Sequence, residues 1–396
     1  MDYFKSDIKR ILFITNCPLS SWSCQRFGMD LLQKNGFAVA VWSYYTYSPE
    51  AAPTPVPNEL SFTKLSELEK ALEELSAETM IVPLFFYNYD TLRIFRAIAR
   101  SDAFLTLVGV NAIPLPTFRA RLLTMSKIIS VIKSPNILPG LVGRLPESLL
   151  SIRPATIFLA GGEASLDAAA HRPMDSSTHI LWTHTLDYDT YLASRDQPMM
   201  QNPSQAVFLD DYTPFHPDND VLHTIPPATA EQYYPVLNRF FDLLEKQLRV
   251  KVVIAAHPRA NYKNKPDFYN GRPLYYNKTH DLIRASSYVM THFSTAIDFA
   301  VLYEKPLLFL TTELLNKHDW YGICIRYFAE WFGKKPIFVD RDNDISWNNE
   351  LKIEEERYQK YKRLFIKKPG SPDEPCWQIF SNFLKAHQPA TNTVRV

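Results

Sequence analysis

Three polar clusters in the sequence could do chemistry, and each directly follows a short apolar run. In chain order they are Asp210-Asp211 after AVFL, His257-Pro258-Arg259 after VVIAA, and Ser294-Thr295 after YVMTHF. Short apolar runs are typical of parallel strands that are covered on both faces. Ligands of open parallel sheets bind outside the carboxyl ends of the strands. We therefore expect the clusters to meet at one sheet edge and to form half of a nucleotide site.

The acidic pair is the candidate for proton transfer or nucleophilic attack. Two adjacent carboxylates at a strand end, Asp210 and Asp211, can act as a general base or a nucleophile toward a bound sugar. Taken alone, such a pair is more often a helix cap or part of a loop salt bridge. Its order with the two other clusters favours the functional interpretation.

The other two clusters could hold a phosphate. His257 can donate a hydrogen bond to a phosphate or sugar oxygen at neutral pH, and Pro258 stiffens the exit from its strand. Ser294 and Thr295 come just before the helical run AIDFAVLYE. Hydroxyls at that position cap free N–H groups or bind a phosphate together with them. A lone strand-end histidine is more often structural, so this interpretation depends on the combination of clusters.

A further acidic candidate, Glu163, lies in the other half of the chain. It follows Gly161-Gly162 at the end of an expected strand, 156–162. Glycines there allow a ligand to approach the backbone closely, and Glu163 would face the same edge. An ordinary strand-to-helix turn is an equally good alternative. The D-x-D spacing of Asp187-Tyr188-Asp189 precedes a tyrosine-rich helix start, so we interpret it as a cap and expect no metal site.

Alternating strands and helices must position these residues. The N-terminal half has expected strands at 10–16, 38–45, 79–85, 104–110, 156–162 and 178–184, with helices at 26–35, 64–76 and 90–100. The C-terminal half has expected strands at 206–211, 252–256, 288–293, 307–311 and 336–340, with helices at 228–248, 350–366 and 374–387. Right-handed crossovers make such sheets parallel. The sequence therefore predicts an α/β protein with two domains that meet near Asn202-Pro203.

The composition fits a soluble two-domain protein. The chain has 396 residues, 46% of them hydrophobic, and a net charge of +1, which gives no sequence-wide attraction to nucleic acid. Its four cysteines form no C-x-x-C pair, so a reducing cytoplasm fits best. The N-terminus lacks the length and cleavage pattern of a signal peptide, and no run approaches the ~20 apolar residues of a membrane span. We expect a cytoplasmic protein, peripheral at the inner membrane at most.

One basic amphipathic segment, 117–134, bears on membrane contact. Its basic residues accompany a row of leucines and isoleucines. Such a helix can lie on a membrane surface or contact an anionic acceptor. It can also be an outer helix whose apolar side packs on the sheet, and we favour this second interpretation.

The order LDDY, AAHPR and THFSTAIDFA resembles the bacterial CMP-sugar glycosyltransferases of the GT-B architecture. That group includes sialyltransferases and Kdo (3-deoxy-manno-octulosonate) transferases, which carry a D/E-D-G motif, an HP motif and a Ser-Ser/Thr motif. The resemblance covers the motif-bearing stretch directly and the rest of the chain only through the two-domain layout. Tyr212 stands where the acidic motif has glycine, and both Asp210 and Asp211 stay candidates for the catalytic carboxylate.

The resemblance implies a GT-B fold of two Rossmann-like domains that face a central cleft. It implies an acceptor-side domain at 1–203, a CMP-binding domain at 204–370 and a tail at 371–396 that packs back on the first domain. Asp211 or Asp210 would be the catalytic carboxylate, and Glu163 would serve the acceptor or acid–base chemistry. His257, Pro258, Arg259, Ser294 and Thr295 would hold the nucleotide.

The implied activity is transfer of an ulosonic acid, Kdo or sialic-acid-like, from a CMP-sugar to a bacterial surface polysaccharide such as lipopolysaccharide or capsule. A CMP-activated ulosonic acid carries two negative charges, which helix-start N–H groups, hydroxyls and His257 can hold without a metal or cofactor. The partners would be the CMP-sugar and a glycan or glycolipid acceptor. Two alternatives stay open: a CDP-glycerol- or ribitol-type polyol-phosphate transferase, and a non-catalytic nucleotide- or glycan-binding module.

Overall fold

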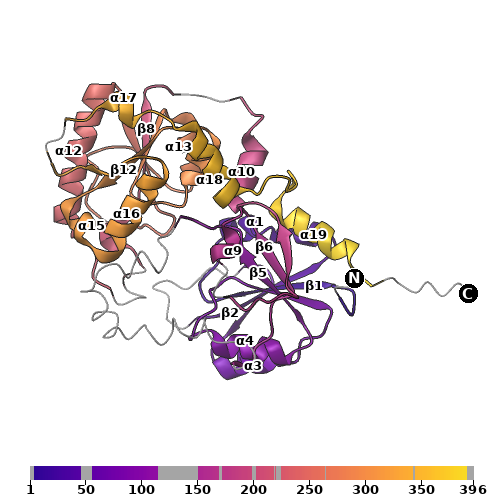
Figure 1. The fold of residues 1–396 in the computed structure, drawn as a ribbon. Helices are drawn as coiled ribbons and strands as arrows, with labels where there is room; N and C mark the ends of the chain where they lie inside the picture. Colours follow the sequence, from indigo (N-terminus) through magenta and orange to yellow (C-terminus); the bar gives the residue numbers. More distant parts are fainter. Residues whose placement is uncertain are drawn as a thin grey trace, which may run out of the picture. The chain divides into compact units, whose positions relative to one another are not determined.

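The computed structural model describes residues 4–45, 56–114, 150–168, 172–198, 202–217, 219, 224–263, 265–341 and 344–389. The expected basic helix at 117–134 lies outside these residues. The described chain forms two compact units (Figure 1). Unit 1 holds the described residues up to Ala112, those from 150 to Asp189, and those from Leu364 onward, and unit 2 holds Thr190–Arg363. The chain thus passes between the units inside helix α10 (Leu186–Ser194) and inside a π-helical turn, Lys362–Ile366.

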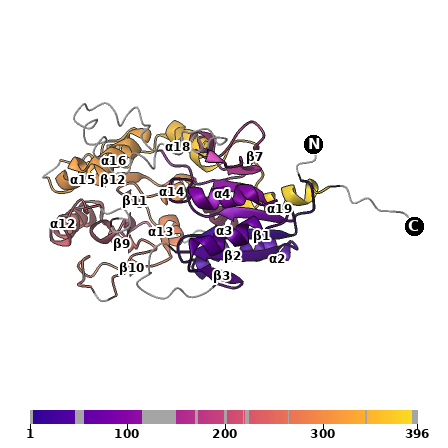
Figure 2. The same cartoon turned by 90° about the horizontal axis from the view of Figure 1, so that it is seen from below.

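The sheet of unit 1 has seven strands in the order β3-β2-β1-β4-β5-β6-β7, and each neighbouring pair is parallel. The strands are β1 (Arg10–Thr15), β2 (Ala38–Tyr44), β3 (Glu59–Phe62), β4 (Thr79–Pro83), β5 (Phe104–Gly109), β6 (Ile157–Ala160) and β7 (His179–Trp182). Figure 2 shows β1, β2 and β3 in this order toward the edge. Parallel pairing requires crossover connections, and in the described part of the chain helices supply those from β1 to β2, β3 to β4, β4 to β5 and β6 to β7.

Both faces of this sheet are buried. Leu12 and Ile14 of β1 belong to one apolar core with helices α3 (Leu65–Glu73) and α4 (Leu92–Arg100). Ile11 and Phe13 belong to the opposite core. The strand alternates its side chains between the two cores, which explains why strands covered on both faces read as continuous apolar runs.

The second core of unit 1 is closed by helices from the two ends of the chain. They are α2 (Met29–Lys34), which follows the short helix α1 (Ser21–Arg26), and the last helix, α19 (Cys376–Ala386). Trp377 of α19 packs edge-on against Phe13, with ring centroids 5.5 Å apart, and its indole N–H donates to the Arg26 carbonyl at 3.2 Å. Unit 1 also contains α9 (Ser165–Ala168).

The sheet of unit 2 has six strands in the order β10-β9-β8-β11-β12-β13, again with parallel pairs. The strands are β8 (Gln205–Leu209), β9 (Lys251–Ala255), β10 (Leu274–Tyr275), β11 (Tyr288–Thr291), β12 (Leu307–Thr311) and β13 (Ile337–Phe338). The order places β8 in the middle, between β9 and β11. The three strands that carry the polar clusters are therefore direct neighbours.

The helices of unit 2 cover this sheet. They are α12 (Ala230–Leu248), α13 (Thr279–Ala285), α14 (Ile297–Leu302), α15 (Glu313–Lys317), α16 (Asp319–Trp331), α17 (Trp347–Glu350) and α18 (Glu355–Tyr361), with a 3-10 turn at Thr213–Phe215. The longest, α12, begins with a capping box between Thr229 and Gln232. Its apolar face packs with Phe208, Val252 and Ile254 of the central strands.

The structure confirms the predicted α/β class with two parallel sheets, and each strand expected from an apolar run is present. The expected helix at 26–35 is divided, because Gly28 adopts a left-handed conformation (φ 59°) between α1 and α2. The expected helix at 350–366 begins later, at Glu355, and ends in the π-helical turn. Strand β3 and helices α15 and α16 were not predicted. None of the described helices is long and apolar enough to span a bilayer.

Candidate functional site at the edge of the second sheet

The three polar clusters lie at one edge of the sheet in unit 2. Because β9, β8 and β11 are parallel neighbours, their carboxyl ends point to the same side. Backbone groups tie the clusters together: a hydrogen bond from the His257 N–H reaches the Asp210 carboxyl, and one from the Phe293 N–H reaches Asp211. The structure thus brings together the acidic pair, the histidine loop and the hydroxyl turn.

Asp210 is a buried carboxylate with an unusually full set of donors. Its side chain is 4% exposed. The Tyr269 hydroxyl and the Tyr212 N–H donate to Oδ1 at 2.9 and 2.8 Å, and the Tyr262 hydroxyl donates to Oδ2 at 2.8 Å. Burial raises the pKa of this carboxyl, and these hydrogen bonds oppose the rise because they stabilise the anion. Both oxygens are occupied by the protein itself, so Asp210 has little capacity left for a substrate.

We call Tyr262, Tyr269 and Tyr234, together with the Asp210 they surround, the tyrosine cage. Tyr234 lies 3.0 Å from Tyr262, hydroxyl to hydroxyl, and therefore donates to the oxygen whose own proton points at Asp210. Burial raises the pKa of the Tyr262 and Tyr269 hydroxyls far above the usual value, so they stay protonated as donors. The cage is a residue set that the sequence did not reveal, because its tyrosines lie in a loop and a helix without a motif.

Asp211 differs sharply from its neighbour. Its side chain is half-buried, and its Oδ2 atom is fully buried with no hydrogen-bond partner. Burial and then the adjacent charge of Asp210 raise the pKa of Asp211 to about 8, against the opposing hydrogen bond from Phe293. A carboxyl with an unpaired oxygen and a pKa near neutrality is suited to exchange a proton with a bound molecule.

Tyr212 occupies a position that favours glycine. Its backbone is left-handed (φ 52°, ψ 33°), which costs about 1 kcal/mol for a residue with a Cβ atom. The turn that this conformation makes lets the Tyr212 N–H reach back to Asp210. Its hydroxyl donates to the Asn261 carbonyl at 3.0 Å, and its ring packs against Tyr262. The tyrosine thus makes a left-handed turn and adds packing on the loop after β9.

The histidine loop projects from β9 beside the acidic pair. The His257 Nδ1 atom accepts a hydrogen bond from the Arg259 N–H at 3.2 Å, which leaves Nε2 as the nitrogen that carries a proton in the neutral ring. The His216 ring packs edge-on against His257, with centroids 4.9 Å apart, and the Arg259 guanidinium lies 3.5 Å from His216 Nε2. Pro258 and Arg259 are exposed. One guanidinium and two imidazole rings, those of Arg259, His257 and His216, therefore lie together in and beside the histidine loop.

The hydroxyl turn precedes the short helix α14. Ser294 donates its N–H to the Thr291 hydroxyl at 3.1 Å and accepts the Ala296 N–H on its own hydroxyl oxygen at 3.3 Å. Ser294 thus closes the turn with its own hydroxyl, while the start of helix α14 has no side-chain cap. Thr295 is exposed at the same turn.

His292, beside this turn, has a structural role. It is fully buried, and its Nδ1 donates to the Leu310 carbonyl at 2.7 Å. Its Nε2 then accepts the Tyr233 hydroxyl at 2.7 Å. Burial lowers the pKa of this ring to about 4, so it is neutral at physiological pH. Both nitrogens are satisfied inside the core.

Glu163 belongs to unit 1, in the turn between β6 and α9. A Cβ atom at Gly161 or Gly162 would overlap the chain's own backbone, at the carbonyls of Val110 and Leu364. The space beside Gly161 is therefore filled mainly by the Val110 carbonyl, and the space beside Gly162 by the Leu364 backbone of the π-helical turn. The Ala164 N–H donates to the Leu364 carbonyl at 2.8 Å in the same place. The glycines are explained by packing, and the role of Glu163 stays a prediction.

The D-x-D pair lies within the first turn of helix α10, and Thr185 caps the helix instead, because its hydroxyl accepts the Tyr188 N–H at 3.3 Å; the predicted cap role of the pair was wrong. Asp187 forms an ion pair with Arg26 at 2.6 Å, and Asp189 accepts the Cys376 N–H at 2.8 Å. Across the described ranges, no three histidine, cysteine or acidic side chains come together as a set that could hold a metal ion. The two aspartates thus connect α10 to Arg26 of α1 and to Cys376 at the start of α19, within unit 1.

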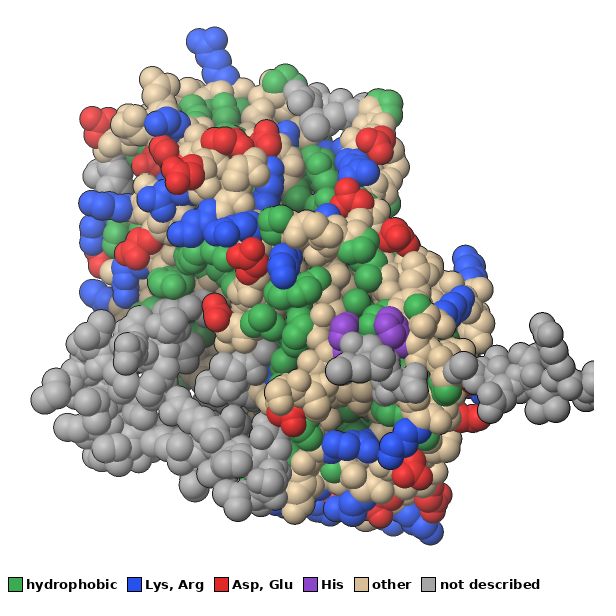
Figure 3. Space-filling view, turned by 45° about the vertical axis from the view of Figure 1, so that its right-hand side comes forward, with side chains coloured by type: hydrophobic (Ala, Val, Ile, Leu, Met, Phe, Trp, Pro, Cys, Tyr) green, Lys and Arg blue, Asp and Glu red, His purple; other side chains and the backbone are tan. Residues whose placement is uncertain are grey.

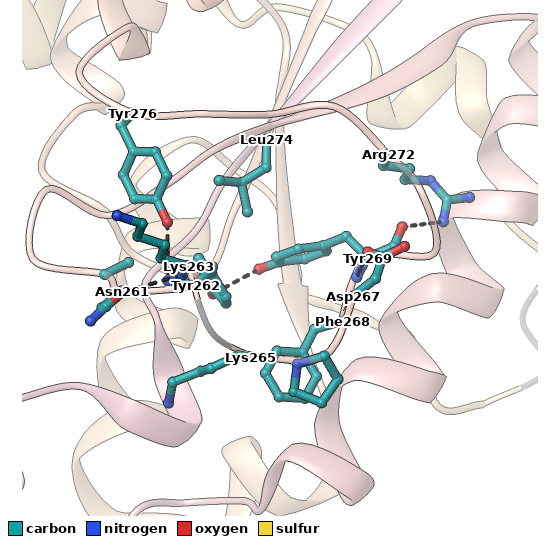
Figure 4. A pocket seen from close by; sticks show the side chains of 12 residues that line it. Asn261, Tyr262, Lys263, Lys265, Asp267, Phe268, Tyr269, Arg272, Leu274 and Tyr276 are labelled. Carbon is teal, nitrogen blue, oxygen red and sulfur yellow. Dashed lines mark hydrogen bonds between the residues drawn. The ribbon is translucent and has the colours of Figure 1, made fainter.

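A cavity of about 630 Å³ lies beside the tyrosine cage, in the loop between β9 and β10 (Figure 4). Tyr262 and Tyr269 line it, with Lys263, Lys265 and Tyr276 among the other lining residues. The Tyr276 hydroxyl accepts the Tyr262 N–H at 3.0 Å. The cage therefore has one side toward Asp210 and the other toward this cavity.

Charges of both signs are mixed on the surface. Figure 3 shows lysine and arginine side chains interspersed with aspartate and glutamate on the face in view. This agrees with the net charge of +1. No large single-sign field is visible on that face.

No protein-family model matches the sequence, and no curated protein matches it. Solved structures do match. A proposed UDP-N-acetylglucosamine 2-epimerase from Listeria monocytogenes gives a TM-score of 0.51 at 14% identity, over 97% of this chain and 98% of that one. The calicheamicin glycosyltransferase CalG4 gives 0.49 at 13%, over 96% and 98%. The wall teichoic acid polymerase TagF gives 0.45 at 12%, over 98% and 89%.

The likeness to the Listeria protein concerns the fold alone, because at 14% identity a shared activity cannot be inferred. It spans nearly the whole of both chains. Together with the two parallel sheets, it shows that this chain has the GT-B fold of two Rossmann-like domains.

Proposed function

We propose that the protein is a glycosyltransferase that moves an ulosonic acid, Kdo or a sialic-acid-like sugar, from a CMP-sugar to a bacterial surface polysaccharide. The observation that carries the proposal is the Asp211 carboxyl. One of its oxygens is buried and unpaired, and it lies at the sheet edge shared with the histidine loop and the hydroxyl turn. The order of the three motifs supports a CMP-sugar as the donor.

Asp211 would act as a general base. An acceptor hydroxyl transfers its proton to the carboxylate as its oxygen forms a bond to the anomeric carbon of the donor sugar. The bond between that carbon and the phosphate oxygen breaks, and CMP leaves with the electron pair. The raised pKa makes the ionised Asp211 a stronger base than an ordinary aspartate, because base strength follows pKa. If the acceptor oxygen attacks the anomeric carbon from the face opposite the leaving phosphate, the configuration at that carbon is inverted.

The negative charges of the donor would be held by groups around the acidic pair. His257 Nε2, the Arg259 guanidinium and the Thr295 hydroxyl are donors that follow β9 and β11, the two strands beside β8. Charge-assisted hydrogen bonds of this kind hold phosphate without a metal ion. Unit 2 is thus the proposed nucleotide-sugar side, and unit 1, with Glu163, the proposed acceptor side. The reaction would take place in the cytoplasm, at the inner membrane where the acceptor is a glycolipid.

The test is donor turnover with CMP-Kdo, CMP-N-acetylneuraminate and CDP-glycerol, each with a glycan acceptor. We expect CMP release with one of the first two, and a loss of at least about 100-fold in rate for Asp211→Asn, as is usual for a general base. The matched control is Asp196→Asn, which removes an exposed carboxyl of unit 2.

We further expect the rate to rise with pH through about 8 in the wild type, because only the ionised Asp211 accepts a proton. Undiminished activity in Asp211→Asn would refute the mechanism. Transfer of glycerol together with its phosphate from CDP-glycerol would favour the polyol-phosphate alternative. Binding of CMP without turnover of any donor would favour a binding module.

A further inference from the structure

The two carboxyls of the acidic pair have opposite environments. Asp210 receives the hydroxyls of Tyr262 and Tyr269 and the N–H of Tyr212 within 2.9 Å. Asp211 keeps a buried oxygen without any partner. No lysine or arginine pairs with either carboxyl in the described part of the chain. Ionising both of two buried neighbouring carboxyls without a cation costs electrostatic free energy, so the pair retains one proton near neutral pH.

We propose that Asp210 is a positioning residue, held as the anion by the tyrosine cage, and that it forces the proton shared by the pair onto Asp211. The proposal rests on the proposed function, in which Asp211 exchanges that proton with the acceptor. Four donors reach the two Asp210 oxygens, which suits an ionised carboxylate because it only accepts hydrogen bonds. The unpaired Asp211 Oδ2 is the atom left to carry the proton.

The groups that face the pair from the surrounding elements do not change this assignment. Burial raises the pKa of the Tyr233 and Tyr234 hydroxyls of α12, so both stay protonated. His292, after β11, has both nitrogens satisfied by Leu310 and Tyr233. The histidine loop contributes a backbone N–H to Asp210. The cage therefore supplies both side-chain donors of Asp210, and the hydroxyl of its third tyrosine, Tyr234, donates to Tyr262.

Tyr262 and Tyr269, the two cage tyrosines that donate to Asp210, also line the cavity. Figure 4 shows the Tyr269 hydroxyl directed at Tyr262 and the Tyr276 hydroxyl directed at the Tyr262 backbone. Removing the hydroxyls of Tyr262 and Tyr269 deletes the two side-chain donors of Asp210 and leaves the rings in place. Tyr276→Phe is the matched control, because Tyr276 lines the same cavity and bonds to the Tyr262 N–H instead of to Asp210.

The experiment uses the full chain with 13C-labelled aspartate carboxyls, assigned with Asp210→Asn and Asp211→Asn. The carboxyl shifts are followed by NMR against pH. In the wild type and in Tyr276→Phe, we expect the Asp211 carboxyl to be protonated and Asp210 ionised at neutral pH. In Tyr262→Phe/Tyr269→Phe the proton moves to Asp210, and the ionisation of Asp211 shifts down by about one pH unit for each lost donor.

Titration curves that are the same in the double variant and the wild type would overturn the proposal. Thermal unfolding of the same samples shows whether each variant is folded, and the single variants Tyr262→Phe and Tyr269→Phe give a graded test. The rising limb of the rate against pH should move down by the same amount as the Asp211 titration. Because NMR reads the proton directly, a failure of the proposed activity would leave this result intact, and the two failures can be told apart.

Discussion

At the scale of single residues, the two aspartates of the acidic pair have the same side chain but different hydrogen-bond environments. Asp210 is saturated with donors, and Asp211 has an oxygen that nothing in the described structure pairs. An unpaired buried polar atom costs about 1–3 kcal/mol, so natural proteins retain few of them. Its presence at a sheet edge beside a histidine and a hydroxyl turn is what one expects of a functional site rather than of a core.

The pH dependence of stability follows from the raised pKa of Asp211. The folded protein holds a proton between about pH 4 and 8 that the unfolded chain releases. This contribution to stability is present in full below about pH 4 and is lost as pH rises through about 8, by at most about 1.4 kcal/mol per pH unit. Asp211→Asn cannot ionise, so we expect it to lack this slope and to be more stable than the wild type at about pH 9.

Urea unfolding of the wild type, Asp211→Asn and Asp196→Asn over this pH range measures the effect. The exposed control should follow the wild type. A variant Asp211→Asn whose stability falls with pH as steeply as the wild type would show that Asp211 is ordinary in its titration. Gain of stability with loss of activity in one variant is the trade-off common at active sites.

The sequence predicted where the acidic pair, His257 and the Ser294 turn would meet, because strand ends of a parallel sheet share an edge. It did not predict the cage. Tyr262 and Tyr269 lie in an irregular loop, where no periodicity tells which way a side chain points. The run NYKNKPDFY after HPRA was the available signal, since tyrosine is rare in polar loops without a partner for its hydroxyl.

At the scale of elements, the π-helical turn holds the end of β6 in place. The Leu364 and Ile366 carbonyls accept the N–H groups of Ala164 and Thr185 at 2.8 and 2.9 Å. Gly161 and Gly162 leave room for this approach because they lack a Cβ atom. The turn therefore bonds through its backbone to segments that follow β6 and β7.

We expect Gly162→Ala to destabilise unit 1 by about 1–3 kcal/mol, because the new methyl group would overlap the Leu364 backbone, which cannot move aside as a side chain would. Gly370→Ala is the control: its surroundings are open, and it should cost only the roughly 1 kcal/mol of a left-handed backbone. Urea unfolding compares the two. An equal or smaller loss in Gly162→Ala would contradict the packing explanation.

The elements that were missed have physical reasons. Strand β3 has exposed central residues, so ELSF lacks the apolar run that identified the other strands. Helix α16 is rich in tryptophan and tyrosine and contains Gly322, all weak helix formers, and its position is set by packing of Cys324, Ile325 and Phe328 in the core. Propensity is a weak guide where tertiary packing decides.

At the scale of the whole molecule, the segment of chain that forms unit 2 lies in the sequence between two parts of unit 1. Unit 1 takes its sheet from the first half of the chain and its closing helix, α19, from the end. Trp377 fills the space above Gly28, where any Cβ atom would overlap the indole ring. The last helix is therefore part of the core of unit 1.

We expect Trp377→Ala to cost about 3–5 kcal/mol and to act on unit 1 alone, because its contacts are with Phe13, Phe27 and Arg26. Hydrogen exchange should accelerate in β1 and β4 while β8 and β9 keep their protection. The matched control, Trp347→Ala, removes a half-buried indole that packs on the core of unit 2 and should show the reverse pattern. Uniform acceleration in both variants would mean that the units unfold together.

The return of α19 to unit 1 has a consequence for how the protein is made. A ribosome completes all of unit 2 before it reaches Cys376–Ala386, the segment that seals the first core. Domains generally fold as units during synthesis. Phe13 and Leu32 in the earlier-made part of unit 1 therefore stay uncovered until this segment has been made. A nascent chain stalled before it would present a hydrophobic surface to chaperones.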